Sequence, residues 1–288
     1  MVTPSASKVQ IIPAMPPSST TDLAGEFDTL DDNIHDLLMR RAELAGQSRP
    51  ASPAKQATTV RRLAARHDGS FPLGVLVRIW REIMASMPGE APQVHVFAGD
   101  QVADYRDLAR AYFGSAAAME SHPSASAVIH ACANETAAFG ILPPPGSDEN
   151  ERPWWAQLSP SGQPGPRVIG RLPLVDAATR QSSAYAIGSL EQEPTGADTT
   201  LIILEANSGL SRTKLRTLIR DAGLEARLLA VGRDSARSRS RQHLLEISGF
   251  VPRDDSRLGV LLEQADDTIQ RVVCVGGYAD PVPQPEAA

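Results

Sequence analysis

The stretch that decides the N-terminal fold runs from residue 22 to residue 45 and reads DLAGEFDTLDDNIHDLLMRRAELA. Its large apolar residues recur in steps of four, three, four, three and seven. They are Leu23, Phe27, Leu30, Ile34, Leu37 and Leu44. A heptad spacing of this kind places apolar side chains along one stripe of an α-helix. We therefore predict a long helix over 22–45 whose apolar stripe requires a partner.

Two shorter helices are predicted after this stretch. A proline-containing break over 48–53 ends the first helix. The second helix spans 54–67, with Val60 and Leu63 facing inward and its arginines mostly facing solvent. In the third, the apolar residues repeat in steps of three and four, namely Leu73, Leu76, Trp80, Ile83 and Met87. A helical unit of about 65 residues is small for a core of its own. We therefore expect a homodimer formed through the first helix.

The periodicity changes after Pro92, where strands begin to alternate with helices. The predicted elements are strand 94–98, helix 104–113, helix 124–133, strand 137–142 and two short apolar runs over 168–174 and 185–190. This order is typical of an α/β layer with some parallel pairing. The segment 146–166 is predicted to be a loop whose Trp154-Trp155 pair covers the apolar surface of the lobe.

The C-terminal part predicts a strand–helix–strand–strand–helix–strand order, which is the ferredoxin-like arrangement. Its elements are strand 200–204, helix 211–222, strands 226–231 and 243–248, helix 256–265 and strand 272–275. The fold class is therefore α+β with several domains. The expected organisation is a disordered tail over 1–21, a three-helix unit over 22–88, a small α/β lobe over 92–190, a ferredoxin-like domain over 198–280 and a second tail over 281–288.

Composition excludes several classes of partner. The chain has 288 residues and a formal net charge of −6. Nucleic acids and anionic membranes both favour a basic surface, so neither is an expected partner. No stretch is apolar enough to span a bilayer, and the first residues lack the pattern of a secretory signal. Cys132 and Cys274 are too few for a disulfide framework, which favours a cytoplasmic location.

Arg41 is a basic residue on the apolar stripe of the first predicted helix. A guanidinium in such a position is costly unless an anion meets it. It extends its charged end to water, pairs with a carboxylate of another helix, such as Glu82, or holds an anionic ligand, for which its planar fork suits a carboxylate. The sequence leaves these alternatives open.

The run LDDNIHDLLMRRAELA over 30–45 resembles the first helix of the all-helical chorismate mutases. The segments 55–67 and 77–84 are similar to the rest of that unit. The resemblance implies an intertwined helical dimer that rearranges chorismate to prephenate without a metal or cofactor. A pericyclic rearrangement requires the substrate to be held in a compact conformer, with donors against the ether oxygen where charge develops.

This resemblance also implies roles for four residues. Arg41 matches the arginine that binds a substrate carboxylate, and Arg49 or Lys55 stands in for the lysine that donates to the ether oxygen. Lys55-Gln56 corresponds to the catalytic Arg-Glu pair of the second helix. Ala24 stands where the family has an arginine that reaches into the partner's site, and the late glutamine of the third helix falls beyond Pro88. Two functions are therefore considered, a mutase and a non-catalytic regulatory or interaction protein.

The rest of the chain is similar to two further modules of the same pathway. VHVFAGD over 94–100 and AAFGILP over 137–143 resemble segments of prephenate dehydratase, but no room is left for that family's second lobe, so dehydration is not expected. The last unit is similar to an ACT regulatory domain. In that comparison Gly209 and Leu210 occupy the amino-acid-binding turn, and the alternative to effector binding is a dimerising sheet.

Three remaining features have simpler explanations. The arginines of RDSARSRSR over 233–241 are expected to lie in a solvated loop, since no aromatic platform accompanies them as in nucleic-acid-binding proteins. His130 and Cys132 point to different faces of a helix and are expected to be packing residues. No metal ligand set is predicted from the sequence.

Overall fold

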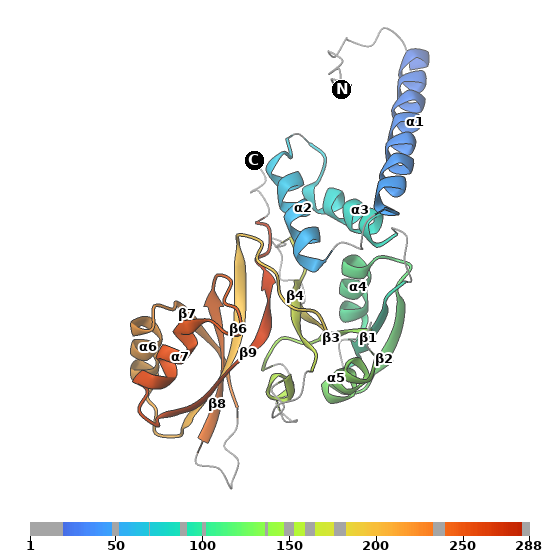
Figure 1. Cartoon of the computed structure of the whole chain (residues 1–288). Coiled ribbons are helices and arrows are strands. Elements are labelled where there is room, and N and C mark those ends of the chain that lie inside the picture. The colour runs from blue at the N-terminus through green and yellow to red at the C-terminus, as the bar shows by residue number, and fades with distance from the viewer. Residues whose placement is uncertain are drawn as a thin grey trace. The chain divides into compact units, whose positions relative to one another are not determined.

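The computed structural model describes residues 20–47, 52–68, 70–86, 91–99, 102–135, 138–146, 153–158, 165–175, 183–232 and 240–283 (Figure 1). The chain divides into two compact units, Met1–Arg49 and Pro50–Ala288. Among the described residues no helix is both long and apolar enough to cross a lipid bilayer.

The first unit contains one helix, α1 (Thr20–Ala45), which agrees with the predicted helix over 22–45. Its apolar stripe is open to solvent in the single chain: Phe27 is 64% exposed and Leu37 is 67% exposed. Leu30, Ile34 and Leu44 are exposed as well. A row of large apolar side chains on one helix face is costly in water. The described residues therefore leave this stripe exposed, and the predicted partner helix would cover it.

The second unit begins with α2 (Pro53–Ala65) and α3 (Leu73–Ala85). Ser52 caps α2, because its hydroxyl oxygen accepts a hydrogen bond from the backbone N–H of Lys55 at 3.3 Å, and a proline opens the first turn. The two helices share a hydrophobic core with Leu174 and Val282, far along the chain. They are thus packed on the C-terminal part of their own unit.

The buried face of α3 differs from the expected one. The structure buries Leu73, Val77, Arg81 and Met84, whereas the predicted stripe contained Leu76, Trp80 and Ile83. Those three side chains are only half-buried. The prediction holds for Leu73, and Leu76 and Trp80 pack against the edge of the same core, but the most buried face is shifted. Because α3 carries apolar residues almost all round, periodicity alone does not select a face.

Arg61 of α2 also departs from its expected outward orientation. Its guanidinium donates hydrogen bonds to Thr195 Oγ1 at 2.8 Å, to the carbonyl oxygen of Ala197 at 2.6 Å and to that of Asp280 at 3.0 Å. These acceptors belong to loops that flank the C-terminal strands. Arg61 therefore fastens α2 to the C-terminal part of the unit, which no local pattern predicts.

All nine described strands join one mixed sheet of order β2-β1-β3-β5-β4-β9-β6-β8-β7. The strands are β1 (Gln93–Phe97), β2 (Ala118–His122), β3 (Ala138–Leu142), β4 (Arg167–Leu172), β5 (Ala184–Gly188), β6 (Asp198–Asn207), β7 (Ala226–Val231), β8 (Ser240–Ser248) and β9 (Ile269–Ala279). β1 pairs in parallel with β2 and β3, and β5 pairs antiparallel with β3 and β4. The predicted α/β layer with some parallel pairing is therefore present.

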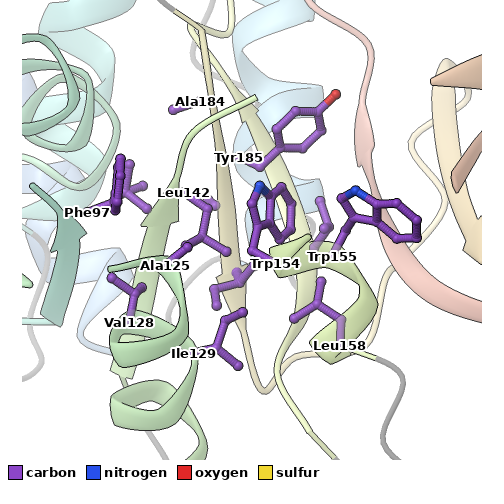
Figure 2. Packing of buried hydrophobic residues seen from close by; sticks show 14 of the residues in the cluster. Phe97, Ala125, Val128, Ile129, Leu142, Trp154, Trp155, Leu158, Ala184 and Tyr185 are labelled. Atoms are coloured by element: carbon purple, nitrogen blue, oxygen red, sulfur yellow. The ribbon is translucent and has the colours of Figure 1, made fainter. Parts of the chain in front are cut away.

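The lobe core lies between this half of the sheet and the helices α4 (Val102–Phe113) and α5 (Ala125–Asn134). Trp154 and Trp155 lie in a short 3-10 helix, η1 (Trp154–Leu158), and are buried as expected (Figure 2). Trp154 packs against Tyr185, with ring centroids 6.0 Å apart. The strand β2 was not predicted, because this edge strand is mostly exposed and shows no apolar alternation.

The C-terminal strands adopt the order β9-β6-β8-β7, all antiparallel, with α6 (Arg212–Asp221) and α7 (Ser256–Gln264) on one face (Figure 1). This is the predicted strand–helix–strand–strand–helix–strand order. The two helices and the strands enclose a separate apolar core. The strands β6, β8 and β9 extend beyond their predicted ends into polar residues, which the apolar pattern does not report.

The two halves of the sheet meet where β4 pairs in parallel with β9, with Val168 opposite Gly276. Gly276 has a φ of +108°, a conformation that glycine tolerates and other residues avoid. A Cβ atom at this position would overlap the backbone oxygen of Val168. The junction therefore depends on the absence of a side chain at position 276.

Candidate functional site

Arg41 lies in the C-terminal half of α1, on the same stripe as Leu37 and Leu44. Arg41 as a whole is half-buried, and its Nη1 atom is shielded from solvent. That atom makes no hydrogen bond, and the guanidinium makes no ion pair, with any residue that the structure describes. A shielded guanidinium nitrogen without a partner is costly. An anion bound to this guanidinium would supply the missing hydrogen-bond acceptor.

Glu82, the carboxylate considered as a permanent partner of Arg41, is engaged elsewhere. Its two carboxylate oxygens accept hydrogen bonds from the backbone N–H of Ser115, at 3.0 and 3.2 Å, and one of them also accepts from the Ser115 hydroxyl. This contact ties α3 to the loop that follows α4. Both carboxylate oxygens of Glu82 therefore have a hydrogen-bond donor within the second unit.

Lys55 and Gln56 lie in the first turn of α2 and face different surroundings. Lys55 is exposed, whereas Gln56 is half-buried. The side-chain oxygen of Gln56 accepts a hydrogen bond of 2.7 Å from Nη1 of Arg81. The two predicted catalytic residues therefore do not converge within the second unit. Arg49, the alternative donor, lies outside the described residues.

Arg81 is a functional candidate that sequence reasoning missed. It is only 3% exposed, and its guanidinium lies 4.1 Å from the ring centre of Tyr112, a cation–π contact. Its Nη2 atom has no hydrogen-bond partner among the described residues. Spacing offered a signal, because Arg81 follows the buried Leu73 and Val77 in steps of four along α3. A charged residue in that register indicates an internal partner.

A small pocket lies beside the N-terminus of α2, between that helix and the central strands. Its polar lining includes Ser52, Tyr112, Arg171, Gln192 and Tyr278. Ser52 donates a hydrogen bond of 2.5 Å to Glu193. The side-chain amide of Gln192 is shielded from solvent and makes no hydrogen bond with the described residues. The pocket thus gathers one guanidinium, one amide and a helix N-terminus, but Glu191 and Glu193 line it too, so its charges are mixed.

A buried carboxylate lies where β5, β8 and β9 approach one another. Glu246 accepts hydrogen bonds from the hydroxyls of Tyr278 at 2.7 Å and Tyr185 at 3.3 Å, and it forms an ion pair with Arg227. Burial, assisted by Glu246, raises the pKa of Tyr185 to about 12. Burial and the neighbouring Tyr185 also raise the pKa of Tyr278. Both hydroxyls therefore stay protonated and act as donors at neutral pH.

Gly209 and Leu210, the residues considered for effector binding, lie in the turn between β6 and α6. The backbone N–H of Leu210 donates to the carbonyl oxygen of Asn207 at 2.9 Å, and Leu210 packs against the C-terminal core. Gly209 is exposed, with open space where a Cβ atom would lie. The turn is thus a surface turn, and the second signature over 231–234 falls partly outside the described residues.

An open groove runs between α6 and the edge strand β7. Its floor is apolar, and its rim carries arginines at steps of four along α6 together with one from β7; these are Arg212, Arg216, Arg220 and Arg227. Residues four apart lie on one face of a helix. The groove thus combines an unpaired strand edge with a positive rim.

No family model matches the chain, and no curated protein matches it.

The solved structures to which the chain is distantly similar include the following three. GqqA, described as a novel type of quorum-quenching acylase, has 15% identity and a TM-score of 0.47, and the alignment covers 66% of this chain and 96% of that one. Prephenate dehydratase from Streptococcus mutans has 13% identity and a TM-score of 0.45, with 66% and 99% coverage. The enzyme from Staphylococcus aureus has 11% identity and a TM-score of 0.42, with 65% and 99% coverage. Similarity at this level assigns no activity.

Proposed function

We propose that the protein is a chorismate mutase of aromatic amino-acid biosynthesis, which rearranges chorismate to prephenate. Its site would form when the α1 helices of two chains meet, so that the substrate is enclosed by helices and held in a compact conformer. The residues assigned to it are Arg41 for a substrate carboxylate and Lys55 for the ether oxygen. Gln56 is the assigned neighbour of Lys55 on α2.

The observation that carries this proposal is the state of Arg41 on α1. The guanidinium lies on an exposed apolar stripe, and its shielded Nη1 atom has no partner among the described residues. Chorismate is a dicarboxylate, so it supplies the anion that this guanidinium lacks. Charge-assisted hydrogen bonds of this kind contribute about 1.5–3 kcal/mol each.

A second candidate function is that of a non-catalytic regulatory or interaction protein built from the same parts. The hydrogen bond between Gln56 and Arg81 favours it, since the oxygen of Gln56 is occupied by an internal guanidinium. Ala24 on α1 also lacks the charge that the mutase resemblance assigns to that position. In this case the protein would bind chorismate or prephenate without turning it over, and the basic groove beside β7 would serve a partner or effector.

The α/β lobe is proposed to act as a scaffold in either case. It contributes β1 to β5 to the central sheet. Its segment over 92–190 leaves no room for the second lobe that the dehydratase resemblance requires. The protein is therefore not proposed to convert prephenate to phenylpyruvate.

The proposal is tested by incubating the purified full-length chain with chorismate and following the loss of chorismate absorbance. Equilibrium binding of chorismate is measured on the same preparation. Arg41→Ala should weaken binding by about tenfold to a few hundredfold, because it removes a charge-assisted contact. Arg40→Ala is the matched control, since Arg40 is its exposed neighbour on α1. Both variants should melt within a few degrees of the wild type.

The outcomes separate the two candidates. Turnover that is lost in Arg41→Ala and kept in Arg40→Ala supports the mutase. Binding without turnover, again dependent on Arg41, supports the non-catalytic alternative. If Arg41→Ala lowers the melting temperature strongly and leaves chorismate affinity unchanged, Arg41 is a structural residue and the proposal is wrong.

A further inference from the structure

A cluster of metal-ligating side chains lies on the lobe, where β1 and β2 run side by side. His95 comes from β1, and Glu120 and His122 come from β2, whose parallel register sets His95 opposite Glu120. Nδ1 of His95 lies 2.8 Å from Nε2 of His122 and 3.8 Å from a carboxylate oxygen of Glu120. Nε2 of His122 lies 4.0 Å from the other oxygen of Glu120. Without a metal, the two imidazole nitrogens share a hydrogen bond, and one ligand atom from each of the three side chains lies within 4.8 Å of the others. A bound metal ion would replace the proton between the two nitrogens.

These separations fit a small divalent cation. Zinc binds imidazole nitrogen and carboxylate oxygen at about 2.0–2.2 Å, so neighbouring ligand atoms around a tetrahedral ion lie roughly 3.4 Å apart. The three observed separations lie on both sides of that value. Two imidazoles and one carboxylate form a ligand set that zinc uses when a fourth position stays open. Only small side-chain movements are needed to reach bonding geometry.

The buried His95 has a carboxylate behind its ring, as metal-ligating histidines commonly do. The side chain of His95 is 2% exposed, and its Nε2 atom makes no hydrogen bond with any described residue. That atom lies 3.5 Å from a carboxylate oxygen of Glu135, the residue that ends α5. A carboxylate behind a histidine fixes the tautomer and leaves the other ring nitrogen unprotonated toward the metal. Glu135 is close enough to accept a hydrogen bond from Nε2 after a small side-chain movement, which would leave Nδ1 of His95 free to bind the metal.

We infer that His95, Glu120 and His122 form a binding site for a divalent metal ion of the zinc class, with Glu135 as a positioning residue. Glu120 is 60% exposed and His122 is 16% exposed, so the fourth coordination position faces solvent. Water or an oxygen atom of a small ligand would occupy it. The site belongs to the lobe and is independent of the proposed mutase residues on α1 and α2.

The test uses the full-length chain with any affinity tag removed and with metal stripped by a chelator. Zinc binding is measured by isothermal titration calorimetry, and thermal melting is recorded with and without zinc. Cobalt is used as a spectroscopic probe, because its visible bands report coordination by the protein. The wild type should bind one zinc ion per chain and melt at a higher temperature when zinc is present.

Three variants and a control complete the design. His122→Ala and Glu120→Gln should each lower zinc affinity by at least about tenfold and reduce the zinc-dependent shift in melting. Glu135→Gln should lower affinity by about 10- to 100-fold, as second-sphere changes do. His130→Ala is the matched control, because His130 is an exposed histidine of the same lobe.

The inference is overturned if the wild type binds no zinc. It is also overturned if His122→Ala binds zinc as tightly as the wild type, or if His130→Ala loses as much affinity as His122→Ala does. These readouts do not involve chorismate, so a failure here leaves the proposed mutase function untouched.

Discussion

At the scale of single residues, the structure turns on a few buried polar side chains whose partners come from distant segments. Arg81 donates to Gln56 and lies over Tyr112, and Glu246 gathers two tyrosines and an arginine. A buried charge is tolerated only when it is paired or hydrogen-bonded. Single substitutions within these groups should therefore have large effects, whereas substitutions at exposed neighbours should have small ones.

Gln56→Leu should destabilise the protein by about 1.5–3 kcal/mol, because the Arg81 guanidinium would lose a hydrogen-bond acceptor in a buried place. Urea unfolding measures the free energy of unfolding. Lys55→Leu is the control, since Lys55 is exposed on the same helical turn, and it should change stability by no more than about 0.5 kcal/mol. Equal effects of the two substitutions would show that the Arg81 contact contributes little.

Stability should fall steeply at alkaline pH, because the pKa of Tyr185 is raised to about 12 by burial and by Glu246. Unfolded tyrosine releases its proton near pH 10, whereas the native state keeps it. The native state therefore binds more protons between about pH 10 and 12, and stability decreases there by up to about 1.4 kcal/mol per pH unit for each such tyrosine.

Tyr185→Phe should flatten this decrease. Urea unfolding at a series of pH values from neutral to alkaline measures the slope. Tyr112→Phe, which removes the hydroxyl of the tyrosine whose ring lies under Arg81, is the control and should leave the slope as in the wild type. If Tyr185→Phe shows the full alkaline slope, the buried hydroxyl is not its source.

At the scale of elements, α1 is notable for a row of large apolar side chains that are exposed to solvent. Five large apolar residues of its heptad stripe are exposed, and each full burial of such a side chain contributes about 1.5–3 kcal/mol. The stripe spans most of a helix of 26 residues. A second α1 helix carries the same stripe and offers the same heptad spacing, so pairing of two chains through α1 is the expected remedy.

Leu37→Asp should convert a dimer into a monomer, because it places a carboxylate in the middle of the paired stripe. Light scattering after size-exclusion chromatography measures the mass in solution. His35→Asp adds the same group at an exposed position off the stripe and should leave the dimer intact. A Leu37→Asp protein that remains dimeric would move the interface to another element, such as the open edge of β7.

At the scale of the whole molecule, the second unit is held together by one continuous sheet. Among the described strands, the lobe and the ferredoxin-like part pair through β4 and β9, with Val168 opposite Gly276. Two side chains add further links: the hydroxyl of Tyr185 donates to Glu246 of β8, and Arg61 joins α2 to the loops beside the C-terminal strands. Damage at the junction should therefore loosen the two halves together.

Gly276→Ala should destabilise the second unit by at least about 1–3 kcal/mol, because alanine is strained at a φ of +108° and its Cβ would overlap the backbone of Val168. Chemical unfolding followed by circular dichroism measures this change. Gly259→Ala is the control: Gly259 lies exposed in α7 with open space around it, and the substitution should stabilise by about 0.5–1 kcal/mol. A neutral Gly276→Ala would mean that the junction relaxes freely.

The sequence by itself determined the local elements whose residues repeat with a clear period. The heptads of α1, the order of strands and helices in the C-terminal part, and the burial of Trp154 and Trp155 were all predictable. Apolar spacing reports how a segment folds, because it reflects which face must leave water. The same pattern also placed Arg41 on the stripe, which made it the candidate ligand residue.

Only the tertiary structure determines which polar groups are hydrogen-bonded to one another. The register of β1 and β2 brings His95 to His122, which is 27 positions away, and packing of α3 on α2 brings Arg81 to Gln56. Sequence patterns also did not predict three further features: the edge strand β2, the buried face of α3 and the inward orientation of Arg61. A hydrogen bond or a ligand set depends on distances across the fold, and residue type and periodicity do not fix those distances.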